Sequence, residues 1–336
     1  MIQRLSKREF IAGTLQRSGC GRLMQLAGSW RGLLVLNYHR IGDGSHSPLD
    51  RQLWSATAEE FDRQIRQVTR DFDVIGLEDL DLVSRRPRGR HVLITFDDGY
   101  LDNYTDAFPI LKSYHAKAAF FVTTGFLDVP RIPWWDEIAW MVRHSPLREM
   151  PANPWTLAPI VMDEPDRTAA ISRLLKIYKQ LDGSKTNAYV EFLAETLRSG
   201  RCASHVAHEL WMTWPMIREM RQSGMTIGGH TVNHPILANL STDEQDFEIG
   251  ECQRRLQQEL REPITAFSYP VGGRSSFDRH TRAALERHGY RWAFTYIGGH
   301  AKTPIADRFA IPRAAVETDI NQPLFHAMLT LPQWFA

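Results

Sequence analysis

A single strand–turn–helix unit limits the folds open to this chain more than any other stretch of its sequence. Residues 92–96 (VLITF) form an almost wholly apolar run, typical of a strand buried on both faces of a parallel sheet. Asp97 and Asp98 follow, and after Gly99 apolar residues recur at helical intervals. The unit therefore places two carboxylates at the carboxyl end of a strand, where α/β proteins carry their active sites. The alternative is that the aspartates only make a turn with the glycine.

Strand and helix patterns alternate along the rest of the chain in the same way. Further strands are predicted at residues 32–40, 73–76, 118–123, 225–227, 264–269, 291–295 and 310–316. Helical patterns separate most of them, which favours one α/β barrel of alternating strands and helices over separate domains. At 336 residues the chain is long enough to bury the core of such a barrel.

The alternation breaks in one long stretch, at about residues 130–212. This stretch contains a Trp-Trp-Asp sequence at 134–136, a proline-rich part and two helical patterns. We interpret it as a helical insertion attached to the rim of a barrel that spans residues 32–336.

The first 31 residues form a basic segment in which apolar residues recur at the spacing of amphipathic helices. One interpretation is a helix packed on the outside of the domain; the other is a basic face resting on a membrane. No apolar run in this segment is long enough for a signal-peptide core or a membrane span. We therefore expect a cytoplasmic protein, with peripheral membrane contact as the alternative.

Composition and missing motifs exclude several classes of protein. A net charge of +1 gives no basis for bulk attraction to nucleic acid, so no nucleic-acid partner is expected. The three cysteines, Cys20, Cys202 and Cys252, form no CxxC pair, which excludes a disulfide framework and a thiolate zinc site. The sequence also lacks the GxSxG, Walker A and GxGxxG patterns.

A second polar cluster, residues 230–234 (HTVNH), follows the short strand at 225–227. Histidines four positions apart lie on one face if the segment is helical, near enough to bind one cation. Together with one aspartate and open positions for water, His230 and His234 would suit a catalytic divalent metal. The alternative is two unrelated surface histidines.

Three segments of the chain together indicate a protein family more specifically than any one of them does alone. In order along the chain, residues 95–99 (TFDDG), 230–234 (HTVNH) and 267–272 (FSYPVG) resemble the motifs of the polysaccharide deacetylase family, also called the NodB homology domain or carbohydrate esterase family 4. Residues 36–41 (LNYHRI) are similar to the first strand of one branch of that family. The resemblance covers roughly residues 33–316 apart from the insertion. It implies a distorted (β/α)7 barrel that removes N- or O-acetyl groups from amino sugars.

The resemblance also implies roles for the residues of these motifs. Asp97 would be the general base, and Asp98, His230 and His234 would bind one divalent metal ion, for which we expect zinc. These roles are chemically consistent, because a bound cation lowers the pKa of water toward about 7 and a neighbouring carboxylate can take the proton. The backbone N–H of Val271 could stabilise the tetrahedral oxyanion.

The sequence departs from the family pattern in three places. Ser268 stands where the third motif usually has arginine, and Val271 where it usually has tyrosine. The late leucine-x-histidine motif, whose histidine is the family's general acid, has no match, and the terminal strand offers Arg313 instead. These departures affect the acid and the substrate contacts, and they leave the base and metal assignments unchanged.

His39 is the candidate for the missing acid, because it ends a predicted barrel strand and histidine suits proton transfer near neutral pH. Arg40 or Arg313 would then replace the arginine that orients Asp97. The alternative is that His39 only hydrogen-bonds a neighbouring loop.

Three residues are candidate substrate contacts: Arg313, Tyr269 and Trp135. Trp135, like its neighbours Trp134 and Asp136, follows soon after the strand at 118–123, so all three should lie near the rim, where an exposed aromatic ring can stack on a sugar. The alternative is that Trp135 anchors the insertion to the barrel, since large aromatic side chains are mostly buried.

The resemblance thus predicts a metal-dependent amide hydrolase that removes the N-acetyl group from an amino-sugar-containing saccharide, such as a precursor of a surface polysaccharide. The substrate would be a saccharide or a lipid- or nucleotide-linked sugar. Two alternatives stay open: a deformylase of a lipid-linked amino sugar, and a non-catalytic carbohydrate-binding relative.

Overall fold

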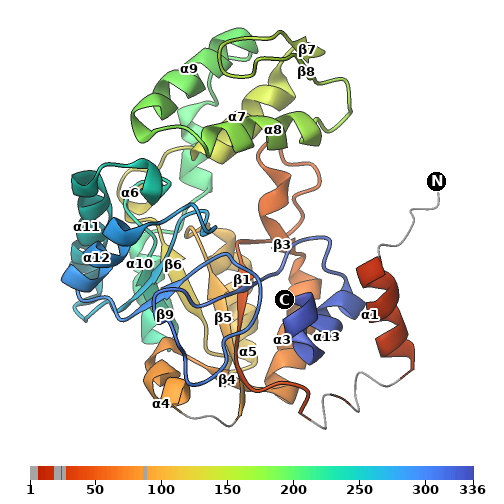
Figure 1. Cartoon of the computed structure of the whole chain (residues 1–336), viewed down its shortest axis with the longest axis vertical. Helices are drawn as coiled ribbons and strands as arrows, with labels where there is room; N and C mark the ends of the chain where they lie inside the picture. Colours follow the sequence, from red (N-terminus) through yellow and green to blue (C-terminus); the bar gives the residue numbers. More distant parts are fainter. Residues whose placement is uncertain (1–6, 19–23, 25–27, 86–88) are drawn as a thin grey trace.

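The computed structural model describes the whole chain except residues 1–6, 19–23, 25–27 and 86–88. Its centre is a curled parallel sheet in which seven strands follow one another in the order β11-β10-β9-β6-β5-β1-β12. A further strand, β4, pairs with residues 91–93 of β5. It lies on the same edge of β5 as β6, which pairs with Thr95 and Phe96. Figure 1 shows this sheet in the lower part of the molecule, with helices around it.

Residues 311–315 bring the two ends of the sheet together. The strands are β1 (Gly32–Tyr38), β4 (Asp73–Ile75), β5 (Arg90–Phe96), β6 (Ala119–Val122), β9 (Thr226–Gly229), β10 (Ala266–Ser268), β11 (Trp292–Phe294) and β12 (Ala314–Ala315). Ile311 forms a parallel bridge with Phe294 of β11, and Ala314 pairs with Leu36 of β1. The predicted distorted (β/α)7 barrel is thereby confirmed.

Helices cover the outside of the sheet, and the sequence accounts for their ends. They are α3 (Ala58–Asp71), α4 (Leu80–Arg85), α5 (Phe108–Ser113), α6 (Thr124–Asp128), α10 (Trp214–Gln222), α11 (Thr242–Leu260), α12 (Arg279–Arg287), α13 (Gln322–Thr330) and α14 (Pro332–Phe335). At the start of α11, Ser241 and Glu244 form a reciprocal capping box. Further along, Ile249, Cys252 and Leu256 are buried, which fixes this helix against the barrel.

Both faces of the sheet are buried, which explains why its strands read as continuous apolar runs. Along β1, Leu34 and Leu36 pack in the cluster that includes the surrounding helices. Leu33 and Val35 pack in a smaller cluster formed mostly by other strands. Burying one such side chain contributes about 1.5–3 kcal/mol, so the barrel is a rigid support for residues at its rim.

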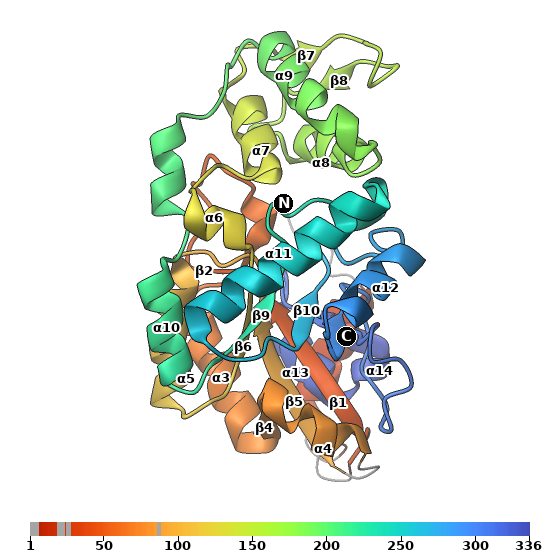
Figure 2. The same cartoon turned by 90° about the vertical axis from the view of Figure 1, so that its left-hand side faces the viewer.

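A separate helical layer covers the carboxyl end of the barrel. It consists of α7 (Trp134–His144), α8 (Thr168–Tyr178), α9 (Thr186–Thr196) and a hairpin of β7 (Glu149–Met150) and β8 (Ile160–Val161). Figures 1 and 2 show this layer above the sheet, and it occupies the stretch interpreted from the sequence as an insertion. The layer has its own core, in which Ile138, Leu174 and Tyr189 are fully buried. At the rim beneath it, β2 (Arg40–Ile41) pairs with β3 (Trp54–Ala56).

The predicted N-terminal helical segment is described in part. Helix α1 (Lys7–Arg17) packs beside α13 (Figure 1), and Arg8 Nη2 donates to the carbonyl of Phe335 at 2.9 Å. The remaining parts of that prediction, residues 1–6, 19–23 and 25–27, fall outside the described residues. Of the helices that the structure describes, none is at once long and apolar enough to cross a bilayer.

Candidate active site

The two aspartates that follow β5 have different partners. The N–H of Asp97 donates to the carbonyl of Tyr38 at 3.1 Å, which extends the pairing of β5 with β1 past the strand end. Asp98 then has a φ of +75°, in the left-handed region that side chains rarely adopt. As a result Asp97 pairs with Arg313, whereas Asp98 faces two histidines.

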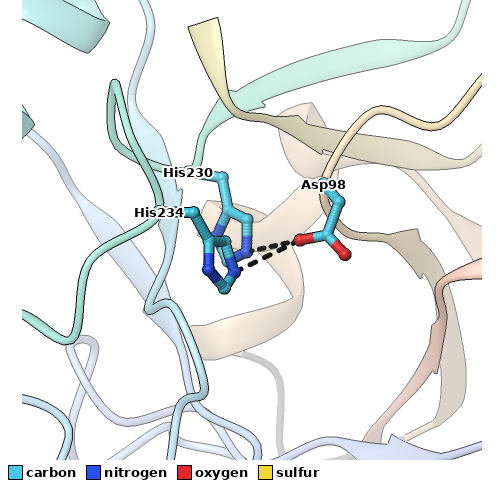
Figure 3. A group of neighbouring side chains, drawn as sticks. All are labelled: Asp98, His230 and His234. Carbon is cyan, nitrogen blue, oxygen red and sulfur yellow. Dashed lines mark ion pairs between the residues drawn. The ribbon is translucent and has the colours of Figure 1, made fainter. Parts of the chain in front are cut away.

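Asp98, His230 and His234 converge on one point (Figure 3). Each histidine Nε2 lies 3.3 Å from Asp98 Oδ1, and the three ligand atoms lie within 4.8 Å of one another. All three residues are buried, with exposed fractions of 2%, 1% and 6%. The structure thus brings together the three residues that were predicted to hold a metal.

The hydrogen bonding of His230 shows that this group suits a cation. His230 Nδ1 lies 2.7 Å from the carbonyl oxygen of Ser268, and a carbonyl only accepts, so Nδ1 carries the proton. That leaves Nε2, the nitrogen that faces Asp98 Oδ1 at 3.3 Å, as the atom that can bind a metal ion. Two imidazole nitrogens with one carboxylate oxygen are a ligand set that suits zinc.

The 230–234 segment is a loop, so the conditional prediction of a helical face does not apply to it. Thr231 and His234 have φ values of +67° and +56°. The N–H of His234 donates to Thr231 Oγ1 at 2.9 Å, which tightens the loop. The two imidazoles meet because the loop folds back on itself, and not because they are one helical turn apart.

Arg313 holds Asp97 by a bidentate ion pair, with nitrogen–oxygen distances of 2.8 and 2.7 Å. Burial raises the pKa of the Asp97 carboxyl, but the Arg313 guanidinium outweighs burial and holds that pKa below its usual range. The other donors of Arg313 go to Thr295, Asn37 and Ser268. This arrangement leaves Arg313 no donor for the direct substrate contact that we expected of it.

Ser268 completes the arrangement around the base. Its Oγ donates to Asp97 Oδ2 at 3.2 Å and accepts from Arg313 Nη2 at 2.9 Å. A serine here is small enough to admit the guanidinium of Arg313, which directly precedes β12. The missing arginine of the third motif is thus replaced by Arg313, whereas Arg40 pairs with Asp102 at 2.8 Å.

Backbone strain is concentrated at this site. Nine non-glycine residues among those described have a positive φ, and four of them belong to the site: Asp98, Thr231, His234 and Val271. Val271, at +62°, is β-branched, for which this conformation is especially unfavourable. Strain of this kind persists where the surroundings enforce it, and it is common at functional sites. Within the described part of the chain, the N–H of Val271 has no acceptor.

His39 lies at the rim, directly after β1. Its backbone is fixed by Ser55 Oγ at 3.0 Å and by Asn103 Nδ2 at 2.7 Å. Its ring lies 5.7 Å from the ring of Tyr296, and no described residue hydrogen-bonds its imidazole. The imidazole is therefore open to a ligand.

A cavity of about 220 Å³ lies between the barrel rim and the helical layer above it. The barrel contributes the predicted residues Asp97, Asp98, His230, His234, His39, Val271, Tyr269 and Arg313. The helical layer contributes Trp134, Trp135, Leu175 and Lys179. One cavity thus gathers the three predicted metal ligands, the predicted base and acid, Val271 and the three predicted substrate contacts.

Tyr269 and Trp135, two of the expected substrate contacts, have their polar groups hydrogen-bonded within the protein. The hydroxyl of Tyr269 donates to the carbonyl of Phe309 at 2.9 Å. Trp135 is 4% exposed; its Nε1 donates to the Tyr100 hydroxyl at 2.8 Å, and its ring lies 4.4 Å from that of His234. Both residues border the cavity, but little of either side chain is open to a ligand.

The sequence matches the family model described as polysaccharide deacetylase over residues 84–156 and 163–293, more than half of the chain. The chain belongs to the polysaccharide deacetylase family. A Bacillus subtilis (strain 168) protein, YxkH, named as a candidate polysaccharide deacetylase, is 22% identical over 301 residues. That match covers 88% of this chain and 76% of YxkH.

The fold of this chain is also similar to that of proteins with solved structures. The Streptococcus pyogenes deacetylase PplD, solved with acetate, matches with a TM-score of 0.59 and 20% identity over 89% of this chain and 97% of its own. IcaB from Ammonifex degensii matches with a TM-score of 0.54 and 20% identity over 90% of this chain and 98% of its own. At this identity the likeness shows the fold alone.

Sequence reasoning missed several residues of this family member's site. Asn37 accepts a hydrogen bond from Arg313 Nη1 at 2.5 Å, and a polar residue inside a buried strand was the available signal. Lys179 borders the cavity from the helical layer, and Asp50 borders it from the barrel side. Nothing in their local sequence sets these two apart, because the folding of the helical layer over the rim brings them to the cavity.

Proposed function

We propose that this chain is a zinc-dependent deacetylase that hydrolyses the N-acetyl group of an amino-sugar-containing saccharide, such as a precursor of a surface polysaccharide. The observation that carries this proposal is the separation of the two aspartates. Asp98 faces two imidazole nitrogens, whereas Asp97 is held by a guanidinium. One carboxylate is thus suited to hold a metal, and its neighbour is suited to accept a proton.

The residues around the cavity account for the chemistry of amide hydrolysis. A zinc ion held by Asp98, His230 and His234 would supply a Lewis acid that polarises the amide carbonyl and lowers the pKa of water toward about 7. Asp97, kept ionised by Arg313, takes the proton of the attacking water. The N–H of Val271 donates to the oxyanion of the tetrahedral intermediate.

His39 supplies the proton that the departing amine needs. Without that proton the tetrahedral intermediate returns to substrate, because an amide nitrogen leaves poorly as an anion. The free imidazole of His39 borders the same cavity as Asp97. We therefore assign the role of general acid to His39, which follows β1, and the role of general base to Asp97, which follows β5.

The test is release of acetate by zinc-loaded protein from N-acetylhexosamines in free, nucleotide-linked and lipid-linked form. We expect acetate from at least one of them, and release slower by about 10²–10⁴ when Asp97→Asn protein replaces the wild type. Release of formate from an N-formyl sugar, with no acetate from any acetylated one, would point to a deformylase. Absence of any released acid would contradict the proposal.

We further propose a cytoplasmic protein that touches the membrane through α1. In this helix Phe10 and Ile11 are 67% and 48% exposed, on a segment rich in basic residues. The two described cysteines, Cys202 and Cys252, are free thiols, as is usual in a reducing compartment. Sedimentation with anionic vesicles, compared between wild type and a Phe10→Ser, Ile11→Ser double variant, tests the membrane contact. Equal sedimentation of the two proteins would contradict it.

A further inference from the structure

Glu248, on α11, closes the loop that carries the two histidines. Its Oε2 accepts hydrogen bonds from the N–H groups of Val232 and Asn233, both at 2.9 Å. Its Oε1 accepts from Asn233 Nδ2 at 2.6 Å. Successive N–H groups that converge on one oxygen form a concave anion site in the backbone, and Glu248 fills it from a side chain that is only 6% exposed.

The loop depends on this carboxylate for its shape. It has no regular secondary structure, and Thr231 and His234 both adopt the left-handed conformation. The first two N–H groups of α6 donate to its carbonyls at 3.2 and 2.9 Å, which fixes one side of the loop. On the other side, the N–H groups of Val232 and Asn233 have Glu248 as their acceptor. Removing that acceptor leaves two partly buried donors without a partner, which favours another loop conformation.

We propose that Glu248 is a positioning residue of the metal centre. Its carboxylate fixes the 230–234 loop so that His230 and His234 turn both Nε2 atoms toward the metal. Glu248 acts through the loop backbone, and α11 supports it because Ile249 and Cys252 beside it are buried. The inference rests on the metal centre of the proposed function, and it adds a residue outside the three family motifs.

The charge of Glu248 is needed as well as its shape. Asn233 Oδ1 accepts from Arg131 Nη2 at 2.7 Å, so Asn233 must turn its NH2 group toward Glu248. A glutamine at position 248 would place its own NH2 against either the backbone N–H groups or the NH2 of Asn233. Flipping Asn233 would only turn that NH2 toward the Arg131 guanidinium. In every arrangement two donors face each other, which a carboxylate avoids.

The test compares Glu248→Gln with Glu251→Gln in the full chain. Glu251 lies on the same helix and pairs with Arg254 at 2.6 Å on the surface, so it controls for loss of one acid from α11. Zinc affinity is measured by competition with a chelator, and the visible spectrum of cobalt(II)-loaded protein reports ligand geometry. Glu248→Gln should weaken zinc binding roughly ten- to hundredfold and alter the spectrum, while Glu251→Gln changes neither. Equal affinities in the two variants would overturn the proposal.

Two further variants keep the proposal testable if Glu248→Gln does not fold. Asn233→Ala removes one of the three donors and should weaken zinc binding roughly fivefold, as expected for one hydrogen bond. Arg131→Leu frees Asn233 to flip, so Glu248→Gln should lose less affinity in that background than in the wild type. Unchanged zinc binding in Asn233→Ala would contradict the positioning role.

The outcomes also separate this inference from the proposed function. Wild-type protein that binds no zinc would contradict both. If the wild type binds zinc tightly but releases no acid from any substrate, only the proposed activity fails, and the affinities of the variants still decide the role of Glu248.

Discussion

The two halves of the candidate site are built in different ways. The metal half comes from two short motifs and consists of Asp98, His230 and His234. The proton-transfer half comes from three separate strand ends and consists of Asp97, His39 and Arg313. The first half depends on local loop conformation, whereas the second depends on closure of the barrel. This difference predicts that a substitution in one half leaves the side chains of the other half in their native arrangement.

The largest effect is expected in the metal half. His234→Ala removes one of three ligands, so purified protein should lose most of its zinc, and turnover should fall at least about a thousandfold. Metal analysis and acetate release check this, with the exposed His208→Ala as the control. Full zinc content in His234→Ala would remove this residue from the metal half.

The acid in the other half is tested by His39→Gln. Turnover should fall by about 10²–10⁴, since a positioned acid contributes that much, while zinc content stays unchanged. The pH–rate profile should lose its alkaline limb, because that limb reports an acid that must be protonated. A profile close to that of the wild type would make His39 a structural residue.

Arg313→Met should shift the pH dependence without removing the base. Asp97 works only when ionised, and Arg313 now holds its pKa below the usual range against the effect of burial. Without the guanidinium, burial raises that pKa, so the acid limb should move to higher pH by roughly one to three pH units. Ser268→Ala keeps the charge and should move the limb much less. An acid limb that stays in place in Arg313→Met would contradict the coupling.

The smallest effect on catalysis is expected for Trp135. Because this side chain is buried and hydrogen-bonded to Tyr100, Trp135→Ala should destabilise the fold by about 3–5 kcal/mol with KM nearly unchanged. Its neighbour Trp134 is partly exposed, stacks on Tyr178 at 4.1 Å and borders the cavity, so Trp134→Ala should raise KM instead. Denaturant unfolding and steady-state kinetics separate the two. A raised KM with normal stability in Trp135→Ala would restore its role as a sugar contact.

The fold was predictable where one physical signal dominates. The apolar run of β5 is typical of a strand buried on both faces, and the capping box at Ser241 and Glu244 marks the start of α11. The approach of Arg313 to Asp97 was not fixed by sequence, since it depends on residues 311–315 joining the two ends of the sheet. From the sequence, Arg40 was an equally good candidate for the arginine that orients Asp97. In the structure the Arg40 side chain pairs with Asp102 instead.

The conformation of the histidine loop was also beyond local reasoning. A four-residue spacing is compatible with a helix, but Thr231 and His234 adopt left-handed backbone in a loop whose N–H groups donate to Glu248 and whose carbonyls accept from α6. A signal was nevertheless present: Glu248 lies on the same buried face of α11 as Cys252. A carboxylate on a buried helix face needs hydrogen-bond donors, and the N–H groups of Val232 and Asn233 in the loop are those donors.

The most direct test compares Asp97→Asn with Asp98→Asn for zinc content and acetate release. The two residues are adjacent and equally buried, so each variant is the other's control. Asp97→Asn should keep zinc and lose turnover by about 10²–10⁴, whereas Asp98→Asn should lose both zinc and turnover. Zinc lost from Asp97→Asn and kept by Asp98→Asn would contradict the assignment of base and ligand.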